Sequence, residues 1–230
     1  MTAFTKFERC FVWMKMKKNP VPVVPWRADS LWSKNPRALL VSVLALFGFG
    51  IGDGLLLQSQ LGNSPWTIFA EGISLHTPLS VGGASLLTSA LILLLWIPLR
   101  IKLGLNTILN SVLIAMAIDA TRLWVPTPEL LWQKALLACV GVLIAGICGA
   151  FYLGANMGAG ARDGVMVAIS ERFGFQVSRV RTAMELFACG SGWLMGGTVG
   201  LGTVLFALLI GPILGKTLAC FAKRYAHLNR

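Results

Sequence analysis

The stretch GFGIGDGLLLQSQLGNSPW, residues 48–66, decides how the chain is interpreted. It continues an apolar segment, yet it holds four alternating glycines, one carboxylate at Asp53 and then a run of amide and hydroxyl side chains. Glycines four residues apart let a neighbouring helix approach closely inside a membrane. Pro65 follows the polar run, and a proline loses least at the first position of a helix. The stretch therefore predicts an apolar helix, a polar break and a second helix.

The composition of the whole chain indicates a membrane protein. Of its 230 residues, 56% are hydrophobic and only 13% are charged, and the mean hydropathy is +0.73. A soluble domain is about 25% charged. A helix needs about 20 apolar residues to cross a bilayer. We predict an all-α polytopic membrane protein, partnered by the lipid bilayer, with six full spans: Leu39–Gln58, Leu79–Leu99, Leu105–Thr121, Ala135–Gly154, Val177–Leu194 and Thr203–Phe221.

Basic residues are concentrated at the start of the chain. The net charge is +11, and eight of the 20 Lys and Arg residues lie before residue 39. Basic segments next to a span remain in the cytoplasm, which explains the charge without nucleic-acid binding. The predicted organisation is a basic cytoplasmic segment (1–38), a first membrane repeat (39–126), a second membrane repeat (131–222) and a basic cytoplasmic tail (223–230).

The two repeats are predicted from matches at an offset of 96 residues. Gly62 matches Gly158, and Gly104-Leu105-x-Thr107 matches Gly200-Leu201-x-Thr203. A fixed offset of this kind indicates internal duplication. Each half contains three spans and one short helix, predicted at Ser64–Leu75 and Ala161–Phe173. Both short helices fall below the roughly 30 Å of the bilayer core, so we expect them to be re-entrant.

Three crossings in each half make the second half inverted, with both termini in the cytoplasm. The alternative is eight crossings with parallel repeats, and the distribution of charge does not decide between the two. In the inverted arrangement the N-termini of both short helices face the middle of the membrane, where their free N–H groups attract anions or carbonyl oxygens. Inverted repeats with interrupted helices recur in secondary transporters.

We predict a substrate-binding site at these two helix starts. Ionisable residues within spans are functional candidates because they are costly in lipid. The predicted residues are Asp53, Gln60, Asn63, Ser64, Trp66, Thr67, Asn156, Arg162, Asp163 and Glu185. Structural alternatives stay open: a polar contact for Asp53, a topological role for Arg162, and an i,i+4 pair with Arg181 for Glu185. Two further expectations concern the outer side, where Asp119 pairs with Arg122 and Glu71 lines a vestibule.

Catalytic and metal motifs are missing from the sequence. The two histidines, His76 and His227, form no HExxH motif, the five cysteines form no CxxC pair, and no GxSxG elbow or phosphate-binding loop occurs. We therefore expect no enzyme activity, no cofactor and no metal. Any use of ATP would require a separate chain.

Four motifs resemble the bacterial YczE/YitT-type integral membrane proteins. They are Leu61-Gly62-Asn63-Ser64-Pro65-Trp66, Gly158-x-Gly160-x-Arg162-Asp163-Gly164, Val177-Ser178-x-Val180-Arg181 and Gly196-Gly197-x-Val199-Gly200-x-Gly202-Thr203. The resemblance implies an inner-membrane protein of the permease kind. The expected function is a transporter or channel for a small polar or anionic solute. The alternative is a binding or assembly subunit that works with a separate ATPase. The glycine-rich spans are compatible with a homodimer.

Overall fold

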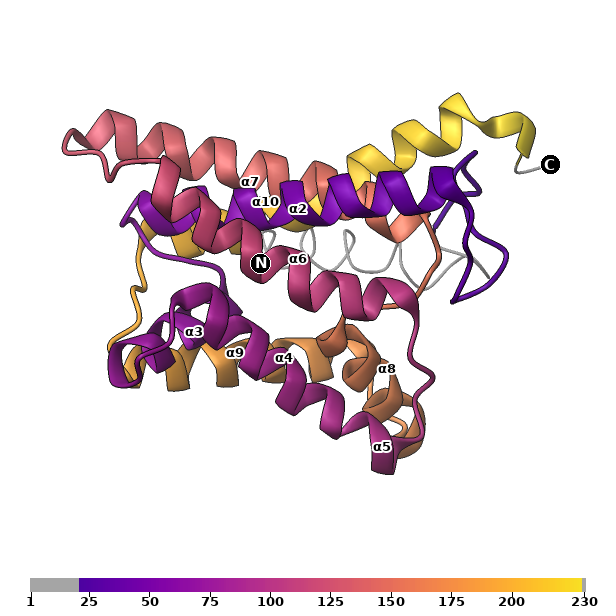
Figure 1. Ribbon diagram of the computed structural model, residues 1–230, viewed down its shortest axis with the longest axis horizontal. Coiled ribbons are helices and arrows are strands. Elements are labelled where there is room, and N and C mark those ends of the chain that lie inside the picture. Colours follow the sequence, from indigo (N-terminus) through magenta and orange to yellow (C-terminus); the bar gives the residue numbers. More distant parts are fainter. Residues whose placement is uncertain (1–20, 229–230) are drawn as a thin grey trace, which may run out of the picture.

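The computed structural model describes residues 21–228, which are helical with no strand in that range (Figure 1). Its helices are α2 (Pro36–Gln58), α3 (Pro65–His76), α4 (Val81–Leu94), α5 (Trp96–Leu99), α6 (Leu105–Trp124), α7 (Leu131–Gly154), α8 (Ala161–Phe173), α9 (Val177–Leu194), α10 (Leu201–Arg224) and the 3-10 turn η2 (Ala226–Leu228). Residues 1–20 of the predicted basic cytoplasmic segment lie outside this range.

Five helical segments in the described part are long and apolar enough to cross a membrane. They are α2, α4 together with α5, α6, α7 and α10. The remaining predicted span, Val177–Leu194, forms helix α9 with the predicted bounds but is not among these five. It carries Arg179, Arg181 and Glu185 within 18 residues, and three charges make crossing costly unless they face protein.

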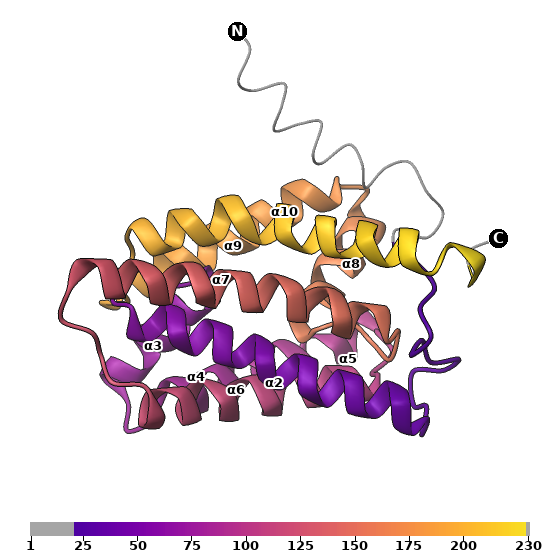
Figure 2. The ribbon, with the colours of Figure 1, turned by 90° about the horizontal axis from the view of Figure 1, so that it is seen from above.

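The helices are arranged in two groups. Figures 1 and 2 show α2, α6, α7 and α10 running side by side, with α3, α4, α8 and α9 gathered against them on one side. Helices α2 and α7 run antiparallel and form the most extensive packing; α6 packs on α2, and α10 packs on α7. The start of α2 and the end of α10 lie at the same end of the bundle.

The glycines of the opening stretch explain the close packing of α2 on its neighbours. A Cβ atom at Gly52 would lie 2.6 Å from the carbonyl oxygen of Gly141, and one at Gly141 would lie 2.6 Å from the carbonyl oxygen of Gly52. On another face of α2, a Cβ at Gly54 would lie 2.6 Å from Thr121 of α6. Larger side chains at these positions would separate α2 from α7 and from α6, since packed interiors have no room to spare.

Contacts between the two halves occur in matching pairs. The loop before α3 docks on the start of α10, where Gly202 N donates to Leu61 O at 2.7 Å. The loop before α8 docks on the start of α6, where Asn106 N donates to Met157 O at 3.0 Å. These two bonds are related by the 96-residue offset with the halves exchanged. Each loop is therefore completed by the other half of the chain.

The loops before α3 and α8 have the same backbone conformation. Gln60 and Asn156 adopt φ values of 55° and 57°, and Gly62 and Gly158 adopt 113° and 119°. Such left-handed conformations favour glycine, because a Cβ is poorly tolerated there. A Cβ at Gly62 would also lie 2.7 Å from Thr203 Oγ1, and one at Gly158 would lie 2.9 Å from Thr107 Oγ1. Only glycine fits these two positions without displacing the partner helix.

Candidate functional site

A buried polar cluster lies where the two short helices begin. Asp53, from the last two turns of α2, is 4% exposed. Its carboxyl group faces Ser64 and Thr67 at the start of α3 and interacts electrostatically with Arg162 at the start of α8. Ser64 Oγ and Thr67 Oγ1 lie 2.8 Å apart and hydrogen-bond to each other. The structure thus brings together five side chains that the sequence predicted for one site, counting Asp163 beside Arg162.

The carboxylate of Asp53 is incompletely satisfied. Its Oδ1 atom is buried and has no hydrogen-bond partner among the described residues. A buried polar atom without a partner costs about 1–3 kcal/mol. Natural proteins keep few such atoms, and each calls for a reason. An acceptor oxygen left open next to two helix starts is the feature expected of a binding site, where a proton or a donor group of the ligand satisfies it.

Arg162 connects the starts of α3 and α8. Its guanidinium carbon lies 4.9 Å from the ring centroid of Trp66, within the range of a cation–π contact. It also interacts electrostatically with Asp53, Asp163, Tyr152 and Glu185. Trp66 and Arg162 come from opposite halves of the sequence and contact each other across the site. They occupy equivalent positions when the halves are compared at the 96-residue offset.

The cluster extends to α7 and α9. Tyr152 of α7 is buried, and its hydroxyl donates to Asp163 Oδ2 at 3.3 Å. On α9, Arg181 Nε and Glu185 Oε1 form an i,i+4 ion pair at 2.9 Å, with side chains 44% and 40% exposed. Arg181 interacts electrostatically with Asp163 and Tyr152 as well. The pairing alternative predicted for Glu185 is therefore present in the structure, beside the cluster and in electrostatic contact with it.

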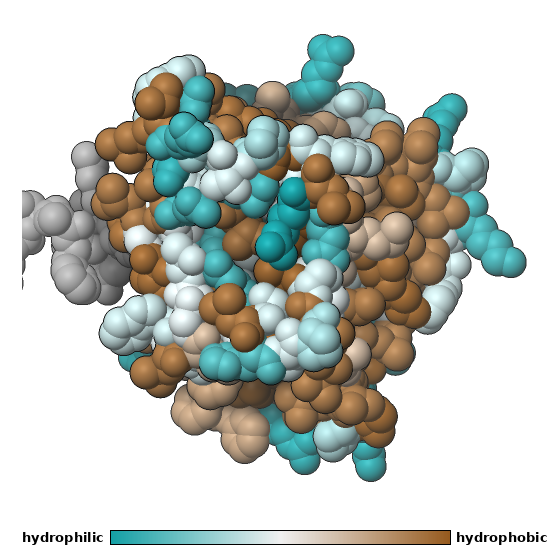
Figure 3. Space-filling view, turned by 60° about the vertical axis from the view of Figure 1, so that its left-hand side comes forward, coloured by the Kyte–Doolittle hydropathy of each residue, from teal (hydrophilic) through white to brown (hydrophobic). Residues whose placement is uncertain are grey.

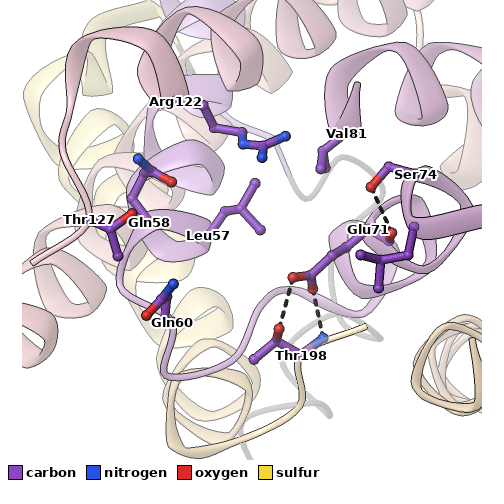
Figure 4. Close-up of a pocket in the computed structure, with 10 residues that line it drawn as sticks. Leu57, Gln58, Gln60, Glu71, Ser74, Val81, Arg122, Thr127 and Thr198 are labelled. Atoms are coloured by element: carbon purple, nitrogen blue, oxygen red, sulfur yellow. Dashed lines mark hydrogen bonds between the residues drawn. The ribbon is translucent and has the colours of Figure 1, made fainter. Parts of the chain in front are cut away.

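A cavity of about 270 Å³ lies one helical turn away from Asp53, at the end of the bundle where α2 finishes (Figure 4). Its lining includes Leu57, Gln58, Glu71, Arg122 and Thr198. Figure 3 shows polar side chains gathered around a hollow on this end face, bordered by apolar surface. The cavity does not reach the buried cluster, because neither Asp53 nor Arg162 lines it. The cluster is closed in this conformation.

Glu71 holds the wall of this cavity together. Its Oε2 accepts a hydrogen bond from Asn63 Nδ2 at 2.8 Å. Thr198 donates twice, from N to Oε2 at 2.7 Å and from Oγ1 to Oε1 at 2.8 Å (Figure 4). These bonds tie α3 to the loop before its own helix start and to the loop between α9 and α10. Glu71 thus lines a cavity; that this cavity opens to the outer side of the membrane stays a prediction.

Three of the predicted site residues lie away from the buried cluster. Asn63 is engaged with Glu71, although its buried Oδ1 has no partner among residues 21–228. Gln60 lines the cavity and accepts a hydrogen bond from Lys134 Nζ at 3.3 Å. Asn156 donates to Ala28 O at 3.3 Å, beside the segment that precedes α2. The last two occupy left-handed positions, so their residue type follows partly from backbone geometry.

The structure differs from the sequence-based expectation for Asp119. This carboxylate accepts from Ser80 Oγ at 2.5 Å and from Gly82 N at 2.9 Å at the start of α4, and forms no ion pair with Arg122. The N-terminus of α4 attracts the carboxylate through its free N–H groups. The side chain of Arg122 instead projects into the cavity (Figure 4).

Tyr152, Arg181 and Thr198 belong to the site or its wall but were not predicted. Tyr152 is embedded in the apolar sequence of α7, where a single tyrosine carries no pattern. Arg181 was predicted only as the alternative ion-pair partner of Glu185. Thr198 reaches Glu71 across 127 residues of sequence.

Comparison with known proteins identifies relatives without a described function. A family model described as "Family of unknown function (DUF6198)" matches residues 36–218. An uncharacterized protein of Haemophilus influenzae is 40% identical over 200 residues, covering 87% of this chain and 92% of that protein. The uncharacterized membrane protein YczE of Bacillus subtilis is 35% identical over 175 residues, covering 74% and 80%. No solved structure matches the chain significantly.

Proposed function

The chain belongs to the DUF6198 family of YczE-type membrane proteins, and from this premise we propose that it is a transporter for a small solute carrying an anionic or polar group. The solute binds between the starts of α3 and α8. Asp53, Ser64, Thr67, Arg162 and Asp163 surround it. The protein resides in the bacterial inner membrane with both termini in the cytoplasm.

The proposed architecture is a pair of inverted repeats. The equal φ values of the loops before α3 and α8 and the exchanged hydrogen bonds at Leu61 and Met157 support it. The antiparallel packing of α2 on α7 supports it too, because inverted repeats pair their equivalent helices in opposite directions. In this arrangement α3 and α8 are re-entrant from opposite sides, and both begin near the bilayer midplane. Transporters with inverted repeats bind their substrates at this depth.

The observation that carries the proposal is the unsatisfied Oδ1 of Asp53 between two helix starts and a guanidinium. Burial of an unpaired acceptor lowers stability, and a bound ligand or proton would remove that cost. The cavity at the end of α2 supplies an access route on one side of the membrane. In the proposed transport cycle, the loop before α3 moves so that the cluster opens to this cavity.

The first test is binding followed by transport. Purified protein is heated with a panel of small carboxylates, phosphate, sulfate and zwitterionic amino acids, and the compounds that raise the melting temperature are then tested by counterflow in liposomes. Arg162→Ala is expected to abolish the response. Arg172→Ala, which removes a guanidinium from the far end of α8, is the matched control and should keep it. Loss of response in both variants, or in neither, would refute the assignment.

The second test concerns topology. Single cysteines at Thr77 and Thr127 in a cysteine-free background should react with an impermeant maleimide from outside, and a cysteine at His227 only from the cytoplasm. Labelling of Thr77 from the cytoplasm alone would make α3 a crossing helix and rule out the inverted arrangement.

A further inference from the structure

The balance of charge in the buried cluster is uneven. Three carboxylates, Asp53, Asp163 and Glu185, interact with two guanidiniums, Arg162 and Arg181. The remaining titratable group that faces them is the phenol of Tyr152, which is neutral as a hydrogen-bond donor to Asp163. The cluster therefore carries one uncompensated negative charge. Such a charge in a low-dielectric interior is costly, and binding a proton or a cation removes it.

The hydrogen bonds identify which carboxylate is uncompensated. Glu185 is paired with Arg181 at 2.9 Å and is partly exposed. Asp163 accepts the Tyr152 hydroxyl and lies in the first turn of α8, where the free N–H groups favour its charge. Asp53 alone of the three is almost fully buried and has an oxygen without a donor. A proton placed on Oδ1 of Asp53 would neutralise the cluster and leave the other pairs intact.

An anionic solute makes this proton necessary. A carboxylate or sulfonate entering the site would add a second negative charge next to the first, and like charges in a low-dielectric site repel strongly. Protonation of Asp53 removes the competing anion from Arg162 and from the start of α3. It also turns Oδ1 from an acceptor into an O–H donor that points into the site. Both changes favour a solute oxygen.

Resting on the function proposed above, we propose that the site binds one proton on Asp53 together with one anionic group of the solute, as a proton–anion symporter. A proton from water attaches to the carboxylate of Asp53, no other bond breaks, and the proton returns to water when the solute leaves. Proton and anion together are neutral, so the net charge of the cluster is the same before and after loading.

Infrared spectroscopy tests the proton site without a solute. As the pH is lowered from alkaline to mildly acidic, the wild-type protein should show a C=O stretch of a protonated carboxylic acid that Asp53→Asn lacks. Glu71→Gln is the matched control, because it removes a carboxylate whose oxygens already accept three hydrogen bonds; its spectrum should retain the band. A band absent from the wild type in this range, or unchanged in Asp53→Asn, overturns the proposal.

Anion binding at two pH values tests the coupling. Methanesulfonate and sulfate, which do not themselves carry a proton in this range, are titrated into each protein with the melting temperature as readout. For the wild type, the apparent dissociation constant should rise about tenfold per pH unit above the protonation midpoint. Asp53→Asn, which mimics the protonated form, should bind without this dependence. If the wild type binds these anions with the same affinity at every pH, proton coupling is overturned, while the proposed transport function stands.

The two proposals fail separately. If neither anion nor any compound of the wider panel binds any variant at any pH while the infrared band of Asp53 is present, the anion-transport function is refuted and the proton site stands as a site of another activity. If solute counterflow occurs and its rate is the same at every pH, the transport function stands and proton coupling is refuted.

Discussion

Replacement of Glu71 by Ala and by Gln should have very different costs. Glu71 accepts three hydrogen bonds, two of them from N–H donors: Asn63 Nδ2 at 2.8 Å and Thr198 N at 2.7 Å. Glu71→Ala leaves both donors without an acceptor, at about 1–3 kcal/mol each, so the expected loss of unfolding free energy is about 2–6 kcal/mol.

Glu71→Gln preserves the contacts. The amide oxygen of Gln at the place of Oε2 can accept from both N–H donors, and its NH₂ group can donate to Thr198 Oγ1, since a hydroxyl accepts as readily as it donates. The three hydrogen bonds then lack the extra strength that the negative charge of the carboxylate gives them. We expect this to lower the free energy of unfolding by about 1–2 kcal/mol. The Ala variant should therefore be more destabilised than the Gln variant, by about 4 against about 1.5 kcal/mol at the midpoints of the two ranges.

Unfolding by SDS in mixed micelles, followed by far-ultraviolet ellipticity, measures both costs. Thr198→Val completes a double-mutant cycle: it should cost about 1 kcal/mol in the wild type and almost nothing in Glu71→Ala, because its partner is then missing. Equal destabilisation by Ala and Gln, or additive effects of Thr198→Val, would show that the hydrogen bonds of Glu71 do not hold the cavity wall.

Three other predictions follow from contacts described above. Gly62→Ala and Gly158→Ala should each cost about 2–5 kcal/mol in the same SDS titration, from the left-handed backbone and the crowded Cβ; Gly190→Ala, in a helix with open space around it, should instead be neutral or stabilising by up to about 1 kcal/mol. Arg162→Lys should weaken solute binding about tenfold, because the planar fork and the stacking on Trp66 are lost; equal affinity in the melting assay would argue against a guanidinium contact. Trp26→Ala should cost about 3–5 kcal/mol, since this buried indole stacks on Phe151 and donates to its carbonyl oxygen at 3.2 Å; unchanged stability would mean that the segment before α2 is not part of the core.

The helices were predictable because glycine and proline mark their ends. The bounds of α8 and α9 agree with the predicted Ala161–Phe173 and Val177–Leu194, and Pro65 begins α3 as expected. The grouping of Asp53 with Arg162 followed from one physical idea, that interrupted helices direct their starts to a common point. The choice of partner for a particular side chain was not predictable. Asp119 had two plausible partners, a guanidinium three residues away and the start of α4 far along the sequence, and only the tertiary packing selects the second.

The amides show the same limit. Asn63, Gln60 and Asn156 all read as polar groups near a membrane break, which is compatible with solute binding and with loop geometry. Their positions distinguish them: Asn63 is held by Glu71, while Gln60 and Asn156 sit at equivalent left-handed positions. A residue that is polar for backbone reasons and one that is polar for a ligand have the same appearance in a single sequence. Tyr152 is the opposite case, a site residue that looks structural. A tyrosine in an apolar helix gives no sign that its hydroxyl donates a hydrogen bond to a carboxylate.

The exchanged docking of the two loops has a consequence for biosynthesis. The bond from Gly202 N to Leu61 O joins residues separated by more than half of the chain. At about 5–20 residues per second, the ribosome reaches residue 202 on the order of ten seconds after residue 61 has been made. During this interval the loop before α3 has emerged into the translocation machinery without its docking partner, so the first half of the protein must remain inserted and incompletely packed until the second half arrives.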